Sequence, residues 1–147
     1  MCVCSPPLSD TVRLSVHHYG EVEAQRHKWI ESEKAGRDLG EWAIRSWVRE
    51  HWHGFLRARW LEHLQGCSFW IELDQDDFGL LERRFEDSPL IDDVLAMLKI
   101  GLENLNVLNW AIDNRLNMAE ILEILEMLDI NSRRIECLFA PHAPMMN

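Results

Sequence analysis

The stretch from residue 38 to residue 64 constrains the fold most, because it is apolar on two sides of one predicted helix. At about 100° per residue, one broad face carries six large apolar side chains: Val48, Trp52, Phe55, Leu56, Trp60 and Leu64. A second apolar patch, on the opposite side, is formed by Ala43, Trp47 and Leu61. A helix that is apolar on two sides packs between neighbours. We therefore expect this helix at the centre of the fold.

A short turn precedes that helix. Residues 21–35 are rich in Glu, Lys, Ala and Gln, which favour helix. Gly36 stands where a left-handed C-terminal cap belongs, and Asp38 and Glu41 have the spacing of a capping box. Helices joined by so short a link fold back on each other. The sequence predicts a helical hairpin that ends at Gly66.

The second half of the chain predicts another hairpin. Ser88–Pro89 is a helix start signal, and a helix is expected from 89 to about 114. Its apolar residues recur every three or four positions: Leu90, Val94, Leu98, Leu102, Leu105, Leu108 and Ile112. Asn117 and Glu120 form a further cap pair before a helix over 118–129.

Two short segments alternate apolar and polar residues, as half-buried strands do. These are 11–17 and 68–74, and we expect them to pair. Residues 76–85 predict a short helix, and 132–138 a last helical turn. The predicted fold is mainly α: a helical bundle built on two helical hairpins, with a small two-stranded β ribbon.

The length of 147 residues fits one domain. We expect a flexible lead at 1–10, a single helical domain at 11–140 and a loose tail at 141–147. Within the domain, a tryptophan- and histidine-rich hairpin half (11–75) precedes an acidic helical half (76–140).

Charge divides the chain in the same way. The net charge is −10, and residues 72–129 hold 4 Lys/Arg against 15 Asp/Glu, whereas residues 1–71 hold 9 of each. An acidic surface repels phosphate backbones, which argues against nucleic-acid binding and suits a basic protein partner. No apolar run approaches the ~20 residues of a membrane span. With no signal-peptide pattern at the N-terminus, we expect a cytoplasmic protein.

A metal site is one alternative. Glu23, His27 and Glu31 are four residues apart, so they share one face of the first helix. Glu50 and His53 form a Glu-x-x-His pair on the second helix. Carboxylates and imidazoles on facing helices hold pairs of iron or manganese ions in bundles, but the full pattern needs a second such pair. The alternative function is a helical protein that binds iron, manganese or zinc; solvated side-chain pairs explain the same residues.

An enzyme of unknown class is the second alternative. Cys67 lies near His63 in sequence, but no nucleophile elbow, phosphate loop or dinucleotide fingerprint is present. No catalytic residue is assigned.

Seven tryptophans favour an interaction protein. Tryptophan dominates protein cores and also interface hot spots. Trp47 lies off the main apolar face, close to Arg45 and His51, so we expect an exposed anchor there, with Trp29 as a further contact. The leading prediction is a non-enzymatic protein–protein interaction protein: an adaptor, accessory subunit or regulator. Self-association is also expected, as a homodimer through 89–129, because its apolar stripe is nearly heptad-spaced.

The motif E-x3-H-K-W-x2-S-E-x-A-G-R-D-x-G, which begins at Glu23 and ends at Gly40, resembles a helical-hairpin segment of uncharacterised bacterial proteins. The resemblance covers residues 20–75. It implies a bacterial, cytoplasmic source and brings no activity or functional residue with it.

Overall fold

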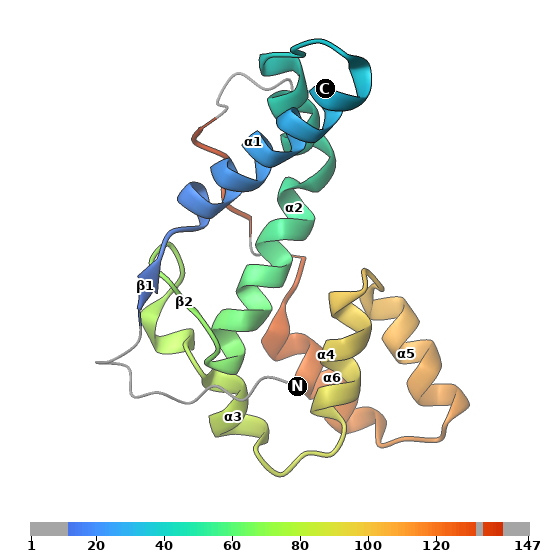
Figure 1. The fold of residues 1–147 in the computed structure, drawn as a ribbon. Coiled ribbons are helices and arrows are strands. Elements are labelled where there is room, and N and C mark those ends of the chain that lie inside the picture. Colours follow the sequence, from blue (N-terminus) through green and yellow to red (C-terminus); the bar gives the residue numbers. More distant parts are fainter. Residues whose placement is uncertain (1–11, 132–133, 140–147) are drawn as a thin grey trace.

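The computed structural model describes residues 12–131 and 134–139. The predicted lead at 1–10 and tail at 141–147 lie outside these residues. Helices dominate the described chain, and one short parallel β pair accompanies them (Figure 1). The expected mainly α fold is therefore confirmed. No helix in the described ranges is long and apolar enough to cross a membrane.

Helices α1 (Val16–Ala35) and α2 (Glu41–Gln65) form the predicted first hairpin. Helix α1 begins five residues earlier than expected, because the side chain of Ser15 accepts a hydrogen bond from the His18 N–H and caps it. The strand predicted over 11–17 consequently shrinks to β1 (Arg13–Leu14).

The predicted pairing of the two alternating segments is confirmed, on a smaller scale. Strand β1 pairs in parallel with β2 (Phe69–Trp70), with Leu14 opposite Trp70. Glu72 then joins this pair to α1, because its carboxylate accepts from the Val16 N–H at 2.8 Å and from the Ser15 hydroxyl at 2.5 Å. One carboxylate thus fixes the point where β1 ends and α1 begins.

The single long helix predicted over 89–114 is wrong. The chain forms α4 (Ile91–Lys99) and α5 (Asn104–Asp113) instead. Gly101 between them has φ +101°, which interrupts a helix, and Glu103 then forms a capping box with Asn106. These two local signals outweigh the continuous apolar stripe.

The remaining elements lie close to their predicted positions. The segment 76–85 forms a 3-10 turn, η2 (Gln75–Asp77), and α3 (Leu80–Phe85). Helix α6 (Met118–Leu128) starts at Asn117, whose side chain accepts from the Glu120 N–H as the cap pair predicted. The last turn expected over 132–138 is wrong for 134–138, which form no helix, and residues 132–133 lie outside the described ranges.

Two apolar clusters hold the described residues together, and α2 contributes to both; the clusters divide α2 along its length, and each takes residues from both of its predicted apolar faces. The first, which we call the base core, joins the end of α2 to α3–α6; its fully or almost fully buried members include Leu61, Leu64, Val94, Leu98, Val107, Ile121, Ile124 and Leu128. The second, the aromatic core, joins α1 to the middle of α2 and includes Val16, Ala24, Trp47, Val48, Trp52, Leu56 and Trp70.

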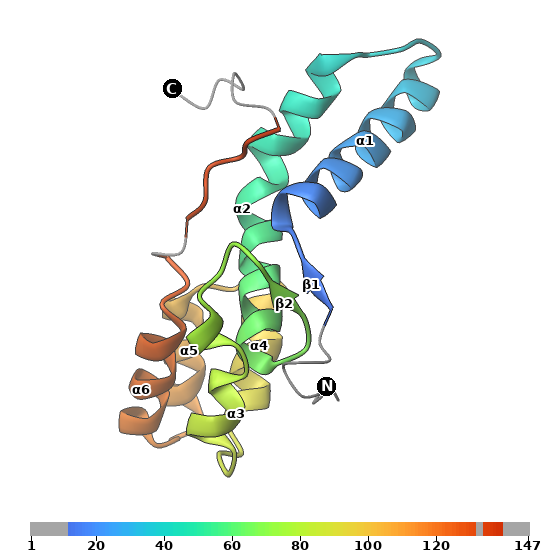
Figure 2. The same ribbon diagram turned by 90° about the vertical axis from the view of Figure 1, so that its left-hand side faces the viewer.

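Residues 134–139 complete the aromatic core. They run along α2 without helix or strand (Figure 2). The Trp52 indole N–H donates to the Ile135 carbonyl at 2.7 Å, and the Phe139 ring lies 5.6 Å from that of Trp52. The end of the described chain therefore packs against its first hairpin.

Candidate functional site

The first hairpin extends beyond both cores. In α1, which is described throughout, the buried residues are Val16, Gly20 and Ala24, and none follows Ala24. Figure 1 shows the turn between α1 and α2 at the end of the molecule opposite α3. We call residues 25–42, which include this turn, the hairpin tip.

Backbone hydrogen bonds close the turn. Gly36 has φ +72°, and its N–H donates to the Glu33 carbonyl at 3.3 Å. The next N–H, that of Arg37, donates to the Ser32 carbonyl at 3.2 Å. These two bonds, donated by the left-handed Gly36 and by the residue after it, resemble a Schellman cap, so the prediction for Gly36 is confirmed.

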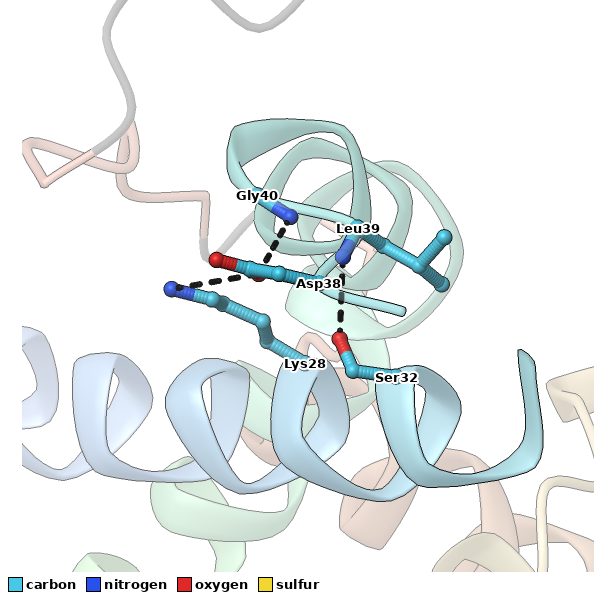
Figure 3. Close-up of polar contacts among 5 residues, drawn as sticks. All are labelled: Lys28, Ser32, Asp38, Leu39 and Gly40. Carbon is cyan, nitrogen blue, oxygen red and sulfur yellow. Dashed lines mark hydrogen bonds and ion pairs between the residues drawn. The ribbon is translucent and has the colours of Figure 1, made fainter. Parts of the chain in front are cut away.

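Side chains then fix the path from the cap to α2 (Figure 3). The Ser32 hydroxyl accepts from the Leu39 N–H at 3.0 Å, and Asp38 accepts from the Gly40 N–H at 2.9 Å. The ammonium of Lys28 lies 4.0 Å from the Asp38 carboxylate. The predicted capping box at Asp38 is wrong, because Gly40 is the N-cap of α2 and Asp38 bonds within the turn.

Two large aromatic side chains stay in water on this tip. Trp29 is 64% exposed and Trp42 is 60% exposed. Each lines an open hollow, and Arg37 lines both. The first has a volume of about 690 Å³ and is lined by Gln25, Lys28, Trp29, Ser32, Glu33, Gly36, Arg37 and Asp38. The second, of about 490 Å³, is lined by Glu31, Lys34, Ala35, Arg37, Leu39 and Trp42.

The hollows combine both signs of charge with aromatic surface. Lys28 and Arg37 line the first hollow beside Glu33 and Asp38. Such a surface can pair with positive and negative side chains of a binding partner around one large apolar side chain, Trp29. That combination is typical of protein interfaces, where tryptophan and arginine are enriched.

The prediction of an exposed anchor at Trp47 is wrong. Trp47 is 7% exposed, and its ring packs against Trp52, Phe55 and Phe139 at 5.7 to 6.3 Å between centroids. Residues 134–139, far away in sequence, supply part of this cover. The side of α2 that its own periodicity left open is thus closed by a distant segment.

The other predicted contact residues divide between two places. Arg45 is exposed and paired with Glu41 at 3.1 Å, whereas His51 lies over Trp47 at 6.2 Å between centroids. Trp29 stands on the hairpin tip, where exposure agrees with its predicted role. Trp42 was missed, because it has the same angular position on α2 as the buried Trp60, five turns away.

The predicted metal ligands do not converge. Glu23 is paired with Arg26 at 3.6 Å, and Glu31 with Lys34 at 3.2 Å. In the described ranges no group of three or more His, Cys, Asp or Glu residues could hold an ion. Across the hairpin, His27 meets the ring of His51 edge to face at 6.0 Å.

The remaining two predicted ligands lie exposed on α2. Glu50 is 3.9 Å from the His51 ring. Partial burial, and then the charge of Arg134, lower the pKa of His53 below 6.5. This cation beside His53 is a poor setting for a second one, so the described residues give the metal alternative no support.

His63 is a buried structural histidine that the sequence did not reveal. It is 0% exposed, and its Nδ1 accepts from the Trp70 N–H at 3.2 Å. Its Nε2 therefore carries the proton and donates to the Asp74 carbonyl at 2.8 Å. Both nitrogens are engaged in holding β2 and η2 on α2, and neither is available as a base. Cys67 is disulfide-bonded, so its sulfur is no thiolate nucleophile either.

Burial is the main cause that lowers the pKa of His63 below 6.5. The hydrogen bond to Asp74 and the charges of Asp77 and Asp74 oppose it. The neutral ring is thus the form that fits the fold.

No protein-family model, curated protein or solved structure matches the chain. The resemblance of residues 20–75 to a bacterial hairpin segment stays a prediction.

Proposed function

We propose that this chain is a non-enzymatic protein–protein interaction protein, an adaptor, accessory subunit or regulator, and that the hairpin tip is its binding surface. The observation that carries the proposal is the exposure of Trp29 and Trp42, at 64% and 60%, on the two hollows. The predicted role of Trp29 is kept, and Trp42 replaces Trp47 as the second anchor.

The aromatic area is large enough to matter for affinity. A tryptophan side chain buries up to about 250 Å². At about 25 cal/mol per Å², burying the exposed part of one such ring gives on the order of 3 kcal/mol. Two rings would supply a large share of the ~8 kcal/mol of a micromolar complex, before the cost of ordering both partners.

The turn lowers that cost. The hydrogen bonds that its Leu39 and Gly40 N–H groups donate to Ser32 and Asp38 hold the two hollows in one arrangement before any partner binds. A surface that is already ordered loses less conformational entropy on binding than a loose loop does.

The compartment stays a prediction. A cytoplasmic location was expected, whereas the disulfide bond at Cys67 is of a kind that persists chiefly in oxidising compartments. Alkylation of thiols in intact cells, followed by mass spectrometry of the Cys67 peptide, decides between the two.

Site-specific photocrosslinking tests the proposed surface. A photoreactive phenylalanine analogue replaces Trp29 or Trp42 in the full chain, and exposed Glu123 on α6 is the control position. We expect discrete crosslinked species from positions 29 and 42 and none of the same mass from position 123. Failure to crosslink from both tip positions, or the same products from all three, would overturn the proposal.

A further inference from the structure

The outer face of α1 carries an uncovered apolar stripe. Tyr19, at one end, is 41% exposed and packs edge-on against Trp70 at 5.5 Å between ring centroids; Val22 is 48% exposed, Trp29 64% and Ile30 38%. The exposed Arg26 lies between Val22 and Trp29 in the sequence, and the exposed Glu33 follows Ile30. At about 100° per residue, all six side chains fall within about 100° of the helix circumference. The opposite face holds the buried Val16, Gly20 and Ala24, so α1 has one face in the fold and one in water (Figure 2).

The spacing of this stripe is that of a helix–helix seam. Positions 19, 22, 26, 29 and 33 advance by three and four residues alternately. That is the spacing of a two-stranded coiled-coil seam, in which positions 26 and 33 here carry charged instead of apolar side chains. An antiparallel pair centred between positions 29 and 30 overlaps over residues 24–35 of each α1, which at 1.5 Å per residue is about 18 Å long.

The order of charges identifies the second helix of such a pair. Arg26 precedes Trp29 and Ile30 by about one turn, and Glu33 follows them by about one turn. Two copies of α1 laid antiparallel, with the dyad between Trp29 and Ile30, place each Arg26 opposite Glu33 of the other copy. The parallel arrangement instead places like charges together, which is repulsive.

We propose that α1 is the interface of an antiparallel homodimer, in which Trp29 packs on Ile30 of the second copy and Arg26 pairs with Glu33 of the second copy. Twofold symmetry makes each contact occur twice. Within one chain, Arg26 lies 3.6 Å from Glu23, with side chains 69% and 42% exposed. So exposed a pair is worth little, and it competes weakly with the new one.

This inference rests on the proposed function, because it names the partner of the same tip. The proposed interface on α1 also replaces the homodimer interface that the sequence predicted over 89–129. There the stripe is interrupted between α4 and α5, and its members Val94 and Leu98 are buried in the base core. A single pair of helices buries an area at the low end of stable interfaces, so a dissociation constant on the order of 10 μM is expected.

A charge swap in the full chain tests the register. Sedimentation equilibrium from about 1 to 500 μM, a range set around that constant, should show a reversible monomer–dimer equilibrium. We expect Arg26→Glu and Glu33→Arg each to weaken dimerisation about tenfold or more, through two like-charged contacts per dimer. The double variant Arg26→Glu/Glu33→Arg should return to within about threefold of wild type. Arg49, exposed on α2, is the matched control, and Arg49→Glu should leave the equilibrium unchanged.

Each other outcome overturns the inference. A wild-type chain that stays monomeric removes the dimer; crosslinks from positions 29 and 42 to another protein would still support the proposed function. A dimer that neither single substitution weakens has its interface elsewhere. A double variant that stays as weak as the singles removes the Arg26–Glu33 register, provided that circular dichroism shows it folded.

Discussion

The two ends of α2 lie in different surroundings. Its C-terminal end enters the base core, where Leu61 and Leu64 are 0% exposed against α3–α6. Its N-terminal end belongs to the hairpin tip, where α1 buries no residue after Ala24 and hydrogen bonds shape the turn. One helix thus joins a region held by apolar burial to a region held by polar geometry.

This difference indicates that folding stability and partner binding depend on different parts of the chain. Burial of apolar area supplies most of the free energy of folding, so the base core and the aromatic core stabilise the chain. Regions with few buried contacts open locally at lower free energy. The tip can therefore expose tryptophan to a partner without loss of the fold.

Truncation of matched isoleucines should give the largest effect. Ile124 is 0% exposed in the base core, and Ile30 is 38% exposed on the tip. We expect Ile124→Ala to lower the free energy of unfolding by about 2–5 kcal/mol, because it leaves a cavity. Ile30→Ala should cost less than about 1 kcal/mol. Urea denaturation measures both, at a concentration below that at which the chain self-associates. Equal losses would contradict the comparison.

Two helical glycines should respond with opposite signs. A Cβ at Gly20 would lie 2.6 Å from Trp52 Cζ3 and 3.2 Å from Phe139 Cε1, inside the aromatic core. We expect Gly20→Ala to destabilise by about 1 kcal/mol, because overpacking outweighs the gain in helix propensity.

Gly54 is the matched control on α2. A Cβ there meets nothing within 4 Å, so Gly54→Ala should stabilise by about 0.5–1 kcal/mol. Thermal and urea unfolding measure the two signs. A stabilised Gly20→Ala would show that residues 134–139 and Trp52 yield easily, and that the aromatic core is as loosely packed as the tip.

Acid should lower the free energy of unfolding through His63, near the C-terminal end of α2, by a smaller amount. Its pKa is lowered in the folded state from 6.5, mainly by burial. The unfolded state then binds more protons, so stability falls as the pH drops below about 6.5. A protonated Nδ1 would also lose the bond from the Trp70 N–H.

The measurement is the free energy of unfolding between pH 7.5 and pH 5. We expect a shallower decline in His63→Gln than in wild type, although that variant is less stable throughout. An unchanged slope in His63→Gln would assign the acid sensitivity to other groups, such as His53.

Local signals predicted much of the fold. Gly36, Gly66 and Asn117 end or begin helices as expected, since each acts on its own neighbours. Periodicity predicted one helix over 89–114, but Gly101 and Glu103 divide it into two. The pairing of 11–17 with 68–74 was found from alternation, but its two-residue extent depends on Glu72 capturing the start of α1.

The candidate site was predicted less well. Trp29 is exposed as its role required, whereas Trp47, expected to be exposed, is buried, and the exposed Trp42 was not singled out. Helical angle says which face a residue occupies, but it does not say where along the axis the covering segments end. For the same reason, spacing aligned Glu23, His27 and Glu31 on α1 without telling which side chains α2 would bring opposite them.

The sequence by itself determined the helical class, the tight turn at Gly36 and the acidic second half, because each depends on residues close together in the chain. Only the tertiary structure decided which tryptophans are buried. Residues 134–139 cover Trp47 and Trp52, while no described segment covers Trp29. Burial depends on which distant segment packs against a helix, and no local pattern carries that information.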